Sequence, residues 1–207
     1  MNNGAVSLIL ISVSGYFSGS IPTAYLIARS VKGIDIRKVG SGNAGATNVF
    51  RVVGKKWGIG VLIFDALKGA FAVCVLPILF PEVGLNPFMV SLAAGLSAIA
   101  GHTWSVWLRF RGGKGVATSA GVFIALAPKP ALAALVFWAL LFTWKRYVSL
   151  ASLGTAACFP LWVLVFYSKT DRFPVLFPIS LLLAAFIFYT HRGNIVRLRS
   201  GTEKRLL

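Results

Sequence analysis

Long apolar runs separated by short polar segments are the feature that most limits how this chain can fold. The runs cover residues 5–28, 58–80, 88–108, 115–127, 131–144, 148–168 and 174–190. A helix needs roughly 20 apolar residues to cross the hydrocarbon core of a bilayer. The sequence therefore predicts an all-α, polytopic integral membrane protein with about seven transmembrane helices. The fourth and fifth runs are short, so five or six crossings also fit the pattern.

Composition favours a membrane protein over a soluble or nucleic-acid-binding one. Hydrophobic residues make up 57% of the 207-residue chain and charged residues 13%. This is more apolar material than one soluble core can bury. The formal net charge is +16, but the basic residues fall between the apolar runs rather than on a water-facing fold. We expect no nucleic-acid partner, and we treat residues 1–207 as a single membrane-embedded domain.

The distribution of Lys and Arg predicts the orientation of the chain. With the N-terminus outside, the inner segments 29–57, 109–114, 145–147 and 191–207 carry 7, 3, 2 and 5 of these residues, 17 in all. The outer segments carry only Lys129, Lys169 and Arg172. Since cytoplasmic loops are enriched in basic residues, the C-terminus and the polar segments should face the cytoplasm. We expect three of the inner segments to converge on one surface.

Two glycine-rich segments, at residues 40–56 and 109–119, begin within these inner segments and combine glycine with basic side chains. Glycine allows backbone N–H groups to approach an anion closely, and Arg51 and Lys114 supply positive charge. Close helix packing is the alternative role for the glycines. Hydroxyl and amide side chains crowd among them, more than packing requires, so a phosphate site is the favoured interpretation. These side chains are Ser41, Asn43, Thr47 and Asn48.

Two nucleotide-binding motifs are imitated here and can be rejected. Gly40, Gly42 and Gly45 spell GxGxxG, with Asp65 twenty residues beyond the last glycine. A dinucleotide site needs its acidic residue at the tip of a strand, whereas Asp65 lies inside an apolar run. The residue after Lys114 is glycine rather than Ser or Thr, so the second segment is not a Walker A loop. The two cysteines form no CxxC pair and no histidine has metal-ligand spacing, so we expect no metal and no cofactor.

Ionisable residues inside or beside the apolar runs are the remaining candidates. Asp65 and Lys68 stand three residues apart, where a helix lets them pair, and we interpret them as a structural ion pair rather than a catalytic one. His102 could help to bind phosphate or could simply be satisfied by backbone. His191 and Asn194 lie on neighbouring helix positions. A functional role and simple positive-inside topology explain this polar C-terminal face equally well.

Known enzyme signatures are missing from these segments. Neither histidine is followed by the acid of a His-x4-Asp acyltransferase. Ser41 lacks the GxSxG elbow and an evident paired base, so donation to phosphate suits it better than nucleophilic attack.

Three strings, GSGNAGATNVFRVVG, GHTWSVWLRFRGGKGVATSAG and HRGNIVRLRSGTE, occur in this order between the apolar runs. They resemble the three cytoplasmic motifs of the bacterial acyl-phosphate-dependent glycerol-3-phosphate acyltransferase family, and the similarity covers essentially the whole chain. The resemblance implies a long-chain acyl phosphate donor and sn-glycerol 3-phosphate as acceptor. Lysophosphatidic acid and phosphate are the implied products, and the implied setting is the bacterial inner membrane among its lipids. Trp104 and Ser105 depart from the Phe-Pro of many members, without touching an anion ligand.

The resemblance also implies roles for individual residues. Those expected in catalysis are Ser41, Arg51, Lys114, His191 and Asn194. Those expected to bind substrate or phosphate are Gly40, Gly42, Asn43, Gly45, Thr47, Asn48, Gly112, Gly113, Gly115 and Thr118. Glu203 matches a position of that family that is expected to be structural. The residues expected to have a structural role are therefore Asp65, Lys68 and Glu203.

An acyl phosphate is already activated, so we expect the glycerol hydroxyl to attack it directly, without an acyl-enzyme. Either His191 or the donor's own phosphate oxygen would take the proton. The alternative function is a transporter of organic phosphate anions, which would use the same basic, glycine-rich site but often shows internal repeats that are not evident here.

Overall fold

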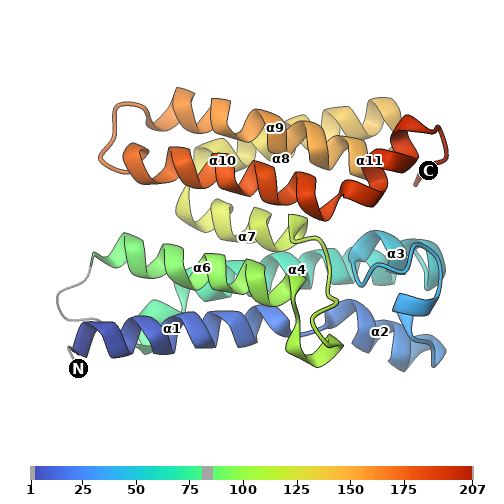
Figure 1. Ribbon diagram of the computed structural model, residues 1–207, viewed down its shortest axis with the longest axis horizontal. Coiled ribbons are helices and arrows are strands. Elements are labelled where there is room, and N and C mark those ends of the chain that lie inside the picture. Colours follow the sequence, from blue (N-terminus) through green and yellow to red (C-terminus); the bar gives the residue numbers. More distant parts are fainter. Residues whose placement is uncertain (1–2, 81–85, 207) are drawn as a thin grey trace. The chain divides into compact units, whose positions relative to one another are not determined.

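The computed structural model describes residues 3–80 and 86–206, and within those ranges it contains helices and connecting segments but no strand (Figure 1). The predicted all-α class is therefore confirmed. Contacts divide the chain into two compact units, Met1–Leu126 and Ala127–Leu207. The single domain expected from the sequence stays a prediction, and the two units are described in turn.

The first unit contains four long helices and several short ones. The long helices are α1 (Asn3–Ser20), α4 (Lys55–Cys74), α6 (Pro87–Thr103) and α7 (Val116–Leu126). The short elements are α2 (Thr23–Lys32), η1 (Ile36–Lys38), α3 (Ala46–Val52), α5 (Leu76–Leu79) and η2 (Val106–Leu108). Both predicted phosphate-binding segments belong to this unit.

A proline interrupts the first apolar run, which the sequence predicted as one helix over residues 5–28. Helix α1 ends at Ser20 and α2 begins at Thr23, with Pro22 between them. Proline has no N–H to donate and disfavours the helical conformation of the residue before it, here Ile21. The break brings backbone carbonyls and the Ser20 side chain toward the interior of the unit.

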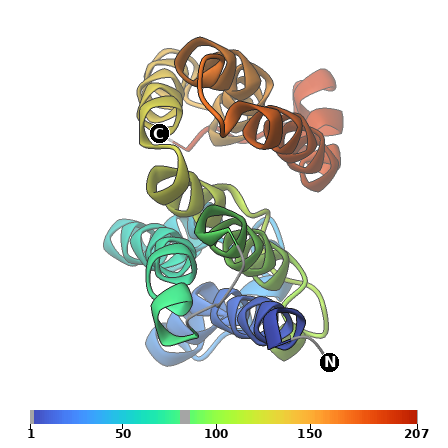
Figure 2. The same ribbon diagram turned by 90° about the vertical axis from the view of Figure 1, so that its left-hand side faces the viewer.

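Close contacts between small residues hold the long helices of the first unit together. Gly19 of α1 packs directly on the backbone of Ala98 in α6, and Gly121 of α7 packs on Ala66 in α4. A side chain at either glycine would overlap that backbone, which is why small residues are favoured at membrane helix interfaces. The two views show α1, α4 and α6 side by side as a result (Figure 2).

A hydrophobic core lies under the polar segments of this unit. It includes Ile36, Val49 and Leu108, which are buried on η1, α3 and η2, together with alanines of α2. This core joins η1 and α3 to η2. It therefore fixes both polar segments beside the N-terminal end of α4 and the C-terminal end of α6 (Figure 1).

The second unit is a helical hairpin extended by one long and one short helix. It comprises α8 (Pro128–Lys145), α9 (Val148–Tyr167), α10 (Phe173–Thr190) and α11 (Arg192–Arg199). Helix α9 packs against both α8 and α10 (Figure 2). The third polar segment lies in α11 and the residues that follow it.

Five helical segments of the described chain are long and apolar enough to cross a membrane, by length and composition. They are Gly4–Lys32, Lys55–Leu79, Pro87–Leu108, Val148–Tyr167 and Phe173–Thr190. Helix α7 is apolar but shorter, as the sequence predicted for its run, and α8 is not among the five. The number of seven crossings and the orientation of the termini stay predictions.

Candidate functional site

One buried asparagine organises the first polar segment. The Oδ1 atom of Asn48 accepts a hydrogen bond from the backbone N–H of Ser41 at 2.9 Å. Its Nδ2 group donates to the backbone carbonyls of Ile36, Val39 and Asn43 at 3.0, 3.0 and 3.1 Å. The side chain is only 1% exposed. The Asn48 side chain thus bonds to the loop and shapes it, and its role in phosphate binding stays a prediction.

Two glycines of this segment are required by the backbone. Gly40 and Gly42 have φ angles of 64° and 71°, in the left-handed region where glycine carries no steric penalty. A Cβ atom at Gly40 would also overlap the Oδ1 atom of Asn48. Gly45 occupies the N-cap position of α3, with Asn43 beside it. The turn holds Ser41 on the exposed side of the loop.

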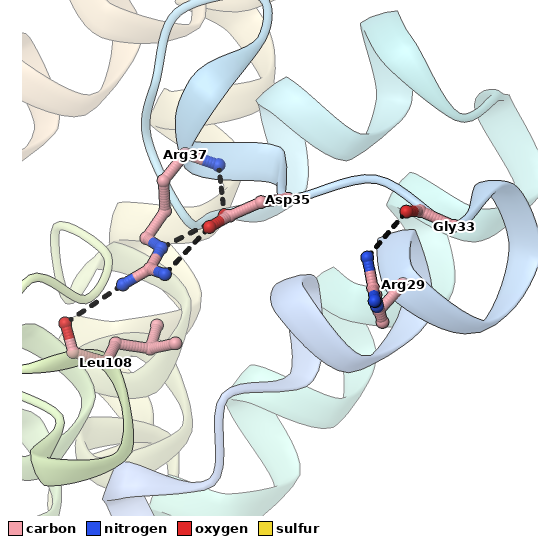
Figure 3. Close-up of polar contacts among 5 residues, drawn as sticks. All are labelled: Arg29, Gly33, Asp35, Arg37 and Leu108. Carbon is pink, nitrogen blue, oxygen red and sulfur yellow. Dashed lines mark hydrogen bonds and ion pairs between the residues drawn. The ribbon is translucent and has the colours of Figure 1, made fainter.

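Arg37, paired with Asp35, links the residues just before the first glycine-rich segment to those just before the second (Figure 3). Two guanidinium nitrogens of Arg37 bind the two carboxylate oxygens of Asp35, at 3.0 and 2.8 Å. The third, Nη1, donates to the backbone carbonyl of Leu108 at 3.1 Å. The hydrogen bond from Arg37 lowers the pKa of Asp35 from 3.8 to about 2. The pair therefore stays charged at any physiological pH.

The second polar segment rests on the C-terminal end of α6. The backbone N–H groups of Gly112 and Gly113 donate to the carbonyls of Thr103 and His102, at 3.0 and 3.1 Å. These two amides are thus hydrogen-bonded within the protein, and the role of the two glycines in binding substrate stays a prediction. The glycines permit close approach, because a Cβ at either position would overlap α6 atoms of His102.

A buried cluster of ionisable side chains lies beneath this loop. The Nζ atom of Lys68 is 2.7 Å from Oδ1 of Asp65, and Nδ1 of His102 is 3.6 Å from the same oxygen. Lys68 also donates to the carbonyl of Ile21 at the break between α1 and α2, at 3.1 Å. The predicted pairing of Asp65 with Lys68 is present in the structure, and His102 joins it. A small pocket is lined by all three side chains and by Gly112 and Gly113.

The charged and hydroxyl candidates of the first unit differ in exposure. Arg51 and Lys114 are half-buried, on α3 and in the glycine-rich loop, while Thr47 is half-buried near the start of α3. Thr118 is fully buried in the first turn of α7, and its hydroxyl has no hydrogen-bond partner among the described residues. Gly115 precedes that helix with a φ of 83°. The segment thus ends in a tight turn that leads directly into α7.

The third polar segment is organised by Glu203, in the second unit. Its Oε1 atom accepts from the Asn194 amide at 2.7 Å and from the Ser149 hydroxyl at 3.0 Å. Its Oε2 atom accepts from Nε of Arg197 at 2.7 Å. Burial by itself raises the pKa of Glu203, but these hydrogen bonds outweigh it and lower the pKa. These contacts join α9 and α11 to the C-terminal segment, and the structural role of Glu203 stays a prediction.

His191 is buried at the junction of α10 and α11, and its Nδ1 atom lies 2.8 Å from the Ile187 carbonyl. A carbonyl only accepts, so Nδ1 carries the hydrogen in this contact. In the neutral ring Nε2 is then the nitrogen able to accept a proton.

Sequence reasoning missed two features of the site. It overlooked the Asp35–Arg37 pair, although an acidic residue two positions before an arginine was a visible signal in a chain with only five acidic residues. It also left open which group partners His102, which no local pattern could settle.

Residues 3–80 and 86–206 bring together no three His, Cys, Asp or Glu side chains that could hold a metal ion.

Comparisons with known proteins identify the family of this chain. Residues 9–201 match the family described as "Glycerol-3-phosphate acyltransferase". The protein of that name from Geotalea daltonii is 47% identical over 95% of this chain and 96% of its own length. The one from Desulforamulus reducens is 42% identical over 97% of this chain and 96% of its own.

Two solved structures are also similar to this chain. Both are crystal structures of PlsY, described as an integral membrane glycerol 3-phosphate acyltransferase. The glycerol 3-phosphate form has a TM-score of 0.84 and 39% identity, covering 96% of this chain and 95% of that one. The lysophosphatidic acid form has a TM-score of 0.81 and 38% identity over the same shares.

Proposed function

Because this chain belongs to the glycerol-3-phosphate acyltransferase family, we propose that it transfers a fatty acyl group from acyl phosphate to sn-glycerol 3-phosphate. The observation that carries the proposal is the family match across residues 9–201, which includes the first two polar segments and the third as far as Gly201. Glycerol 3-phosphate and lysophosphatidic acid appear in the descriptions of the two PlsY structures. The match favours an acyltransferase over the alternative of an anion transporter.

We further propose that the reaction takes place at the cytoplasmic face of a bacterial inner membrane. The 17 basic residues of the predicted inner segments support this orientation. Both substrates are anions, so positive charge is needed before they can approach each other. Arg51 and Lys114 would supply it, with the hydroxyl groups of Ser41, Thr47 and Thr118 as further donors.

The reaction requires the protein mainly to position its two substrates. The glycerol C1 oxygen attacks the carbonyl carbon of the acyl phosphate, and the bond from that carbon to the phosphate oxygen breaks. The phosphate leaves with the bonding electron pair, and the hydroxyl proton passes to a base. That base is either Nε2 of His191 or an oxygen of the departing phosphate. Holding the two reactants together supplies much of the rate enhancement.

We propose that Ser41 orients a phosphate rather than forming an acyl-enzyme. Its backbone N–H is tied to Asn48, and among the described residues no histidine hydrogen-bonds to its hydroxyl. A serine needs such a base to act as a nucleophile. The donor is already activated, so direct transfer avoids the additional step.

The test is to incubate the purified protein with palmitoyl phosphate and glycerol 3-phosphate and to detect lysophosphatidic acid by mass spectrometry. Palmitoyl-CoA as the only donor serves as the comparison, since product from it alone would contradict the proposed donor. A second reaction omits glycerol 3-phosphate and searches for acyl label on the protein. Kinetically competent label at Ser41 would refute direct transfer, whereas intersecting initial-rate patterns without label would support it.

A further inference from the structure

The buried cluster of Asp65, Lys68 and His102 has no part in the chemistry described so far. Asp65 and Lys68 are 2% and 9% exposed, inside a helix long enough to cross a membrane. Ionisable residues at such depth are costly, and a pair of them is on average no more stabilising than apolar residues of the same size. An ion pair whose two charges only neutralise each other would therefore contribute little to stability.

The His102 ring connects the ionic cluster to the glycine-rich loop. Its Nδ1 atom faces the Asp65 carboxylate at 3.6 Å. Its opposite edge packs on Gly113, so closely that a Cβ there would overlap Nε2 and would lie 2.7 Å from Cε1. The ring therefore fills the space between a buried carboxylate of α4 and the glycine-rich loop.

The backbone repeats this connection. The carbonyl of His102 accepts the N–H of Gly113, and the neighbouring carbonyl of Thr103 accepts the N–H of Gly112. Lys68 ties the other side of Asp65 to Ile21 at the α1–α2 break. The loop that carries Lys114 is thus held on α6, and the ionic cluster joins that end of α6 to α4 and to the break between α1 and α2.

We propose that His102, held in place by the Asp65–Lys68 pair, is a positioning residue for the loop at residues 112–115. Through this loop it sets the affinity for glycerol 3-phosphate. The inference rests on the proposed function for its kinetic consequence, but the order of the loop can be measured without turnover. Neither Asp65 nor Lys68 needs to contact substrate for this role.

The decisive variant is the double substitution Asp65→Asn with Lys68→Met, which removes both charges at nearly constant volume. A self-neutralising pair would tolerate this change, because no uncompensated charge is left. If the pair holds His102, the KM for glycerol 3-phosphate rises by about tenfold or more, while the KM for palmitoyl phosphate changes by less than about twofold. Parental values of both constants would overturn the proposal.

The second variants act on the ring itself and keep the proposal testable if the double variant does not fold. His102→Phe retains a ring but loses both nitrogens, and His102→Gln retains polar atoms on a flexible chain. We expect His102→Phe to raise the KM for glycerol 3-phosphate by about tenfold and His102→Gln by less, since the amide can still meet Asp65. Equal, parental constants for both variants would contradict a positioning role.

Loop order is measured independently by limited trypsin cleavage in lipid nanodiscs. Arg109, Arg111 and Lys114 provide cleavage sites in and beside the loop. We expect cleavage there to be several-fold faster in the double variant, with an unchanged rate at the C-terminal segment. Phe64→Leu, at a 62% exposed position of α4, is the matched control and should behave as the parent.

The two measurements separate this inference from the proposed function. If the parent protein makes no lysophosphatidic acid, the proposed function fails, while the cleavage rates still decide whether the cluster orders the loop. If the parent is active and the variants cleave and turn over as it does, only the positioning role is wrong.

Discussion

The guanidinium of Arg37 donates a hydrogen bond to the backbone carbonyl of Leu108, 71 positions further along the chain. Arg37 lies just before the first glycine-rich segment and Leu108 just before the second. Asp35 holds the other side of the guanidinium, so Arg37 cannot turn away without losing an ion pair. This contact sets the spacing between the two segments that carry Ser41 and Lys114.

Replacing Arg37 by lysine should lower turnover although the charge is kept. A single ammonium cannot bind both oxygens of Asp35 and the Leu108 carbonyl in the geometry of a planar guanidinium. We expect kcat/KM for glycerol 3-phosphate to fall by about tenfold. Arg29→Lys is the control, because Arg29 only caps its own helix at Gly33 (Figure 3) and should retain parental activity. Equal losses in both variants would contradict the linking role of Arg37.

The same pair makes a prediction about pH. The pKa of Asp35 is lowered in the folded protein, so its contribution to stability is complete above its ordinary pKa of 3.8. The contribution is lost as the pH falls from 3.8 through about 2. The difference in thermal unfolding midpoint between parent and Asp35→Asn should therefore be constant from pH 5 to 8. Equal midpoints of parent and variant within that window would show that the pair does not stabilise the fold.

Asn48→Ala should disorder the first polar segment. The substitution leaves the Ser41 N–H and three backbone carbonyls without their side-chain partner, at about 1–3 kcal/mol for a buried polar group. Activity should fall together with the thermal midpoint. Asn86→Ala removes an asparagine that caps α6 at Phe88, and should lower stability modestly while activity is retained. An active, stable Asn48→Ala protein would refute the role of Asn48 as loop organiser.

Gly113→Ala should impair the protein through contact with His102 rather than through backbone strain. The added methyl group would overlap the buried ring, so the loop or α6 must move. We expect the KM for glycerol 3-phosphate to rise by about tenfold or more. Gly60→Ala provides the comparison, because nothing lies within 4 Å of where its added methyl group would sit and α4 favours alanine. Glycerol 3-phosphate titrations of the two variants in parallel distinguish a local clash from a general effect of glycine removal.

Glu203→Gln should destabilise the second unit at neutral pH. Glu203 joins Ser149, Asn194 and Arg197, and hydrogen bonds to a charged group contribute about 1.5–3 kcal/mol. Because its folded pKa is lowered, this stabilisation is present above the ordinary value of 4.5 and is lost as the pH falls below it. Unfolding midpoints of parent and variant should thus differ at pH 7, and the difference should begin to narrow as the pH falls below 4.5 toward 4. A constant gap over that range would argue against a charged Glu203.

Local pattern was sufficient for the helical elements and for the pairing of Asp65 with Lys68. Apolar length predicts a spanning helix wherever it occurs, and residues three apart meet on one helix face in any protein. The glycine-rich segments were recognised for the same local reason. Local pattern did not show that the amides of Gly112 and Gly113 and the side chain of Asn48 bind backbone groups, and the phosphate site itself stays a prediction.

The sequence by itself therefore determined the helical membrane class, the three polar segments and, through their residues, the family. Only the tertiary structure decided that Arg37 reaches Leu108, that His102 stands between Asp65 and Gly113, and that Glu203 holds Asn194. The physical reason is separation along the chain. Hydrophobic periodicity and turn chemistry act between residues a few positions apart, whereas these contacts depend on how the helices pack. A hydrogen bond or a close contact forms only when its two atoms are placed to within a few tenths of an ångström.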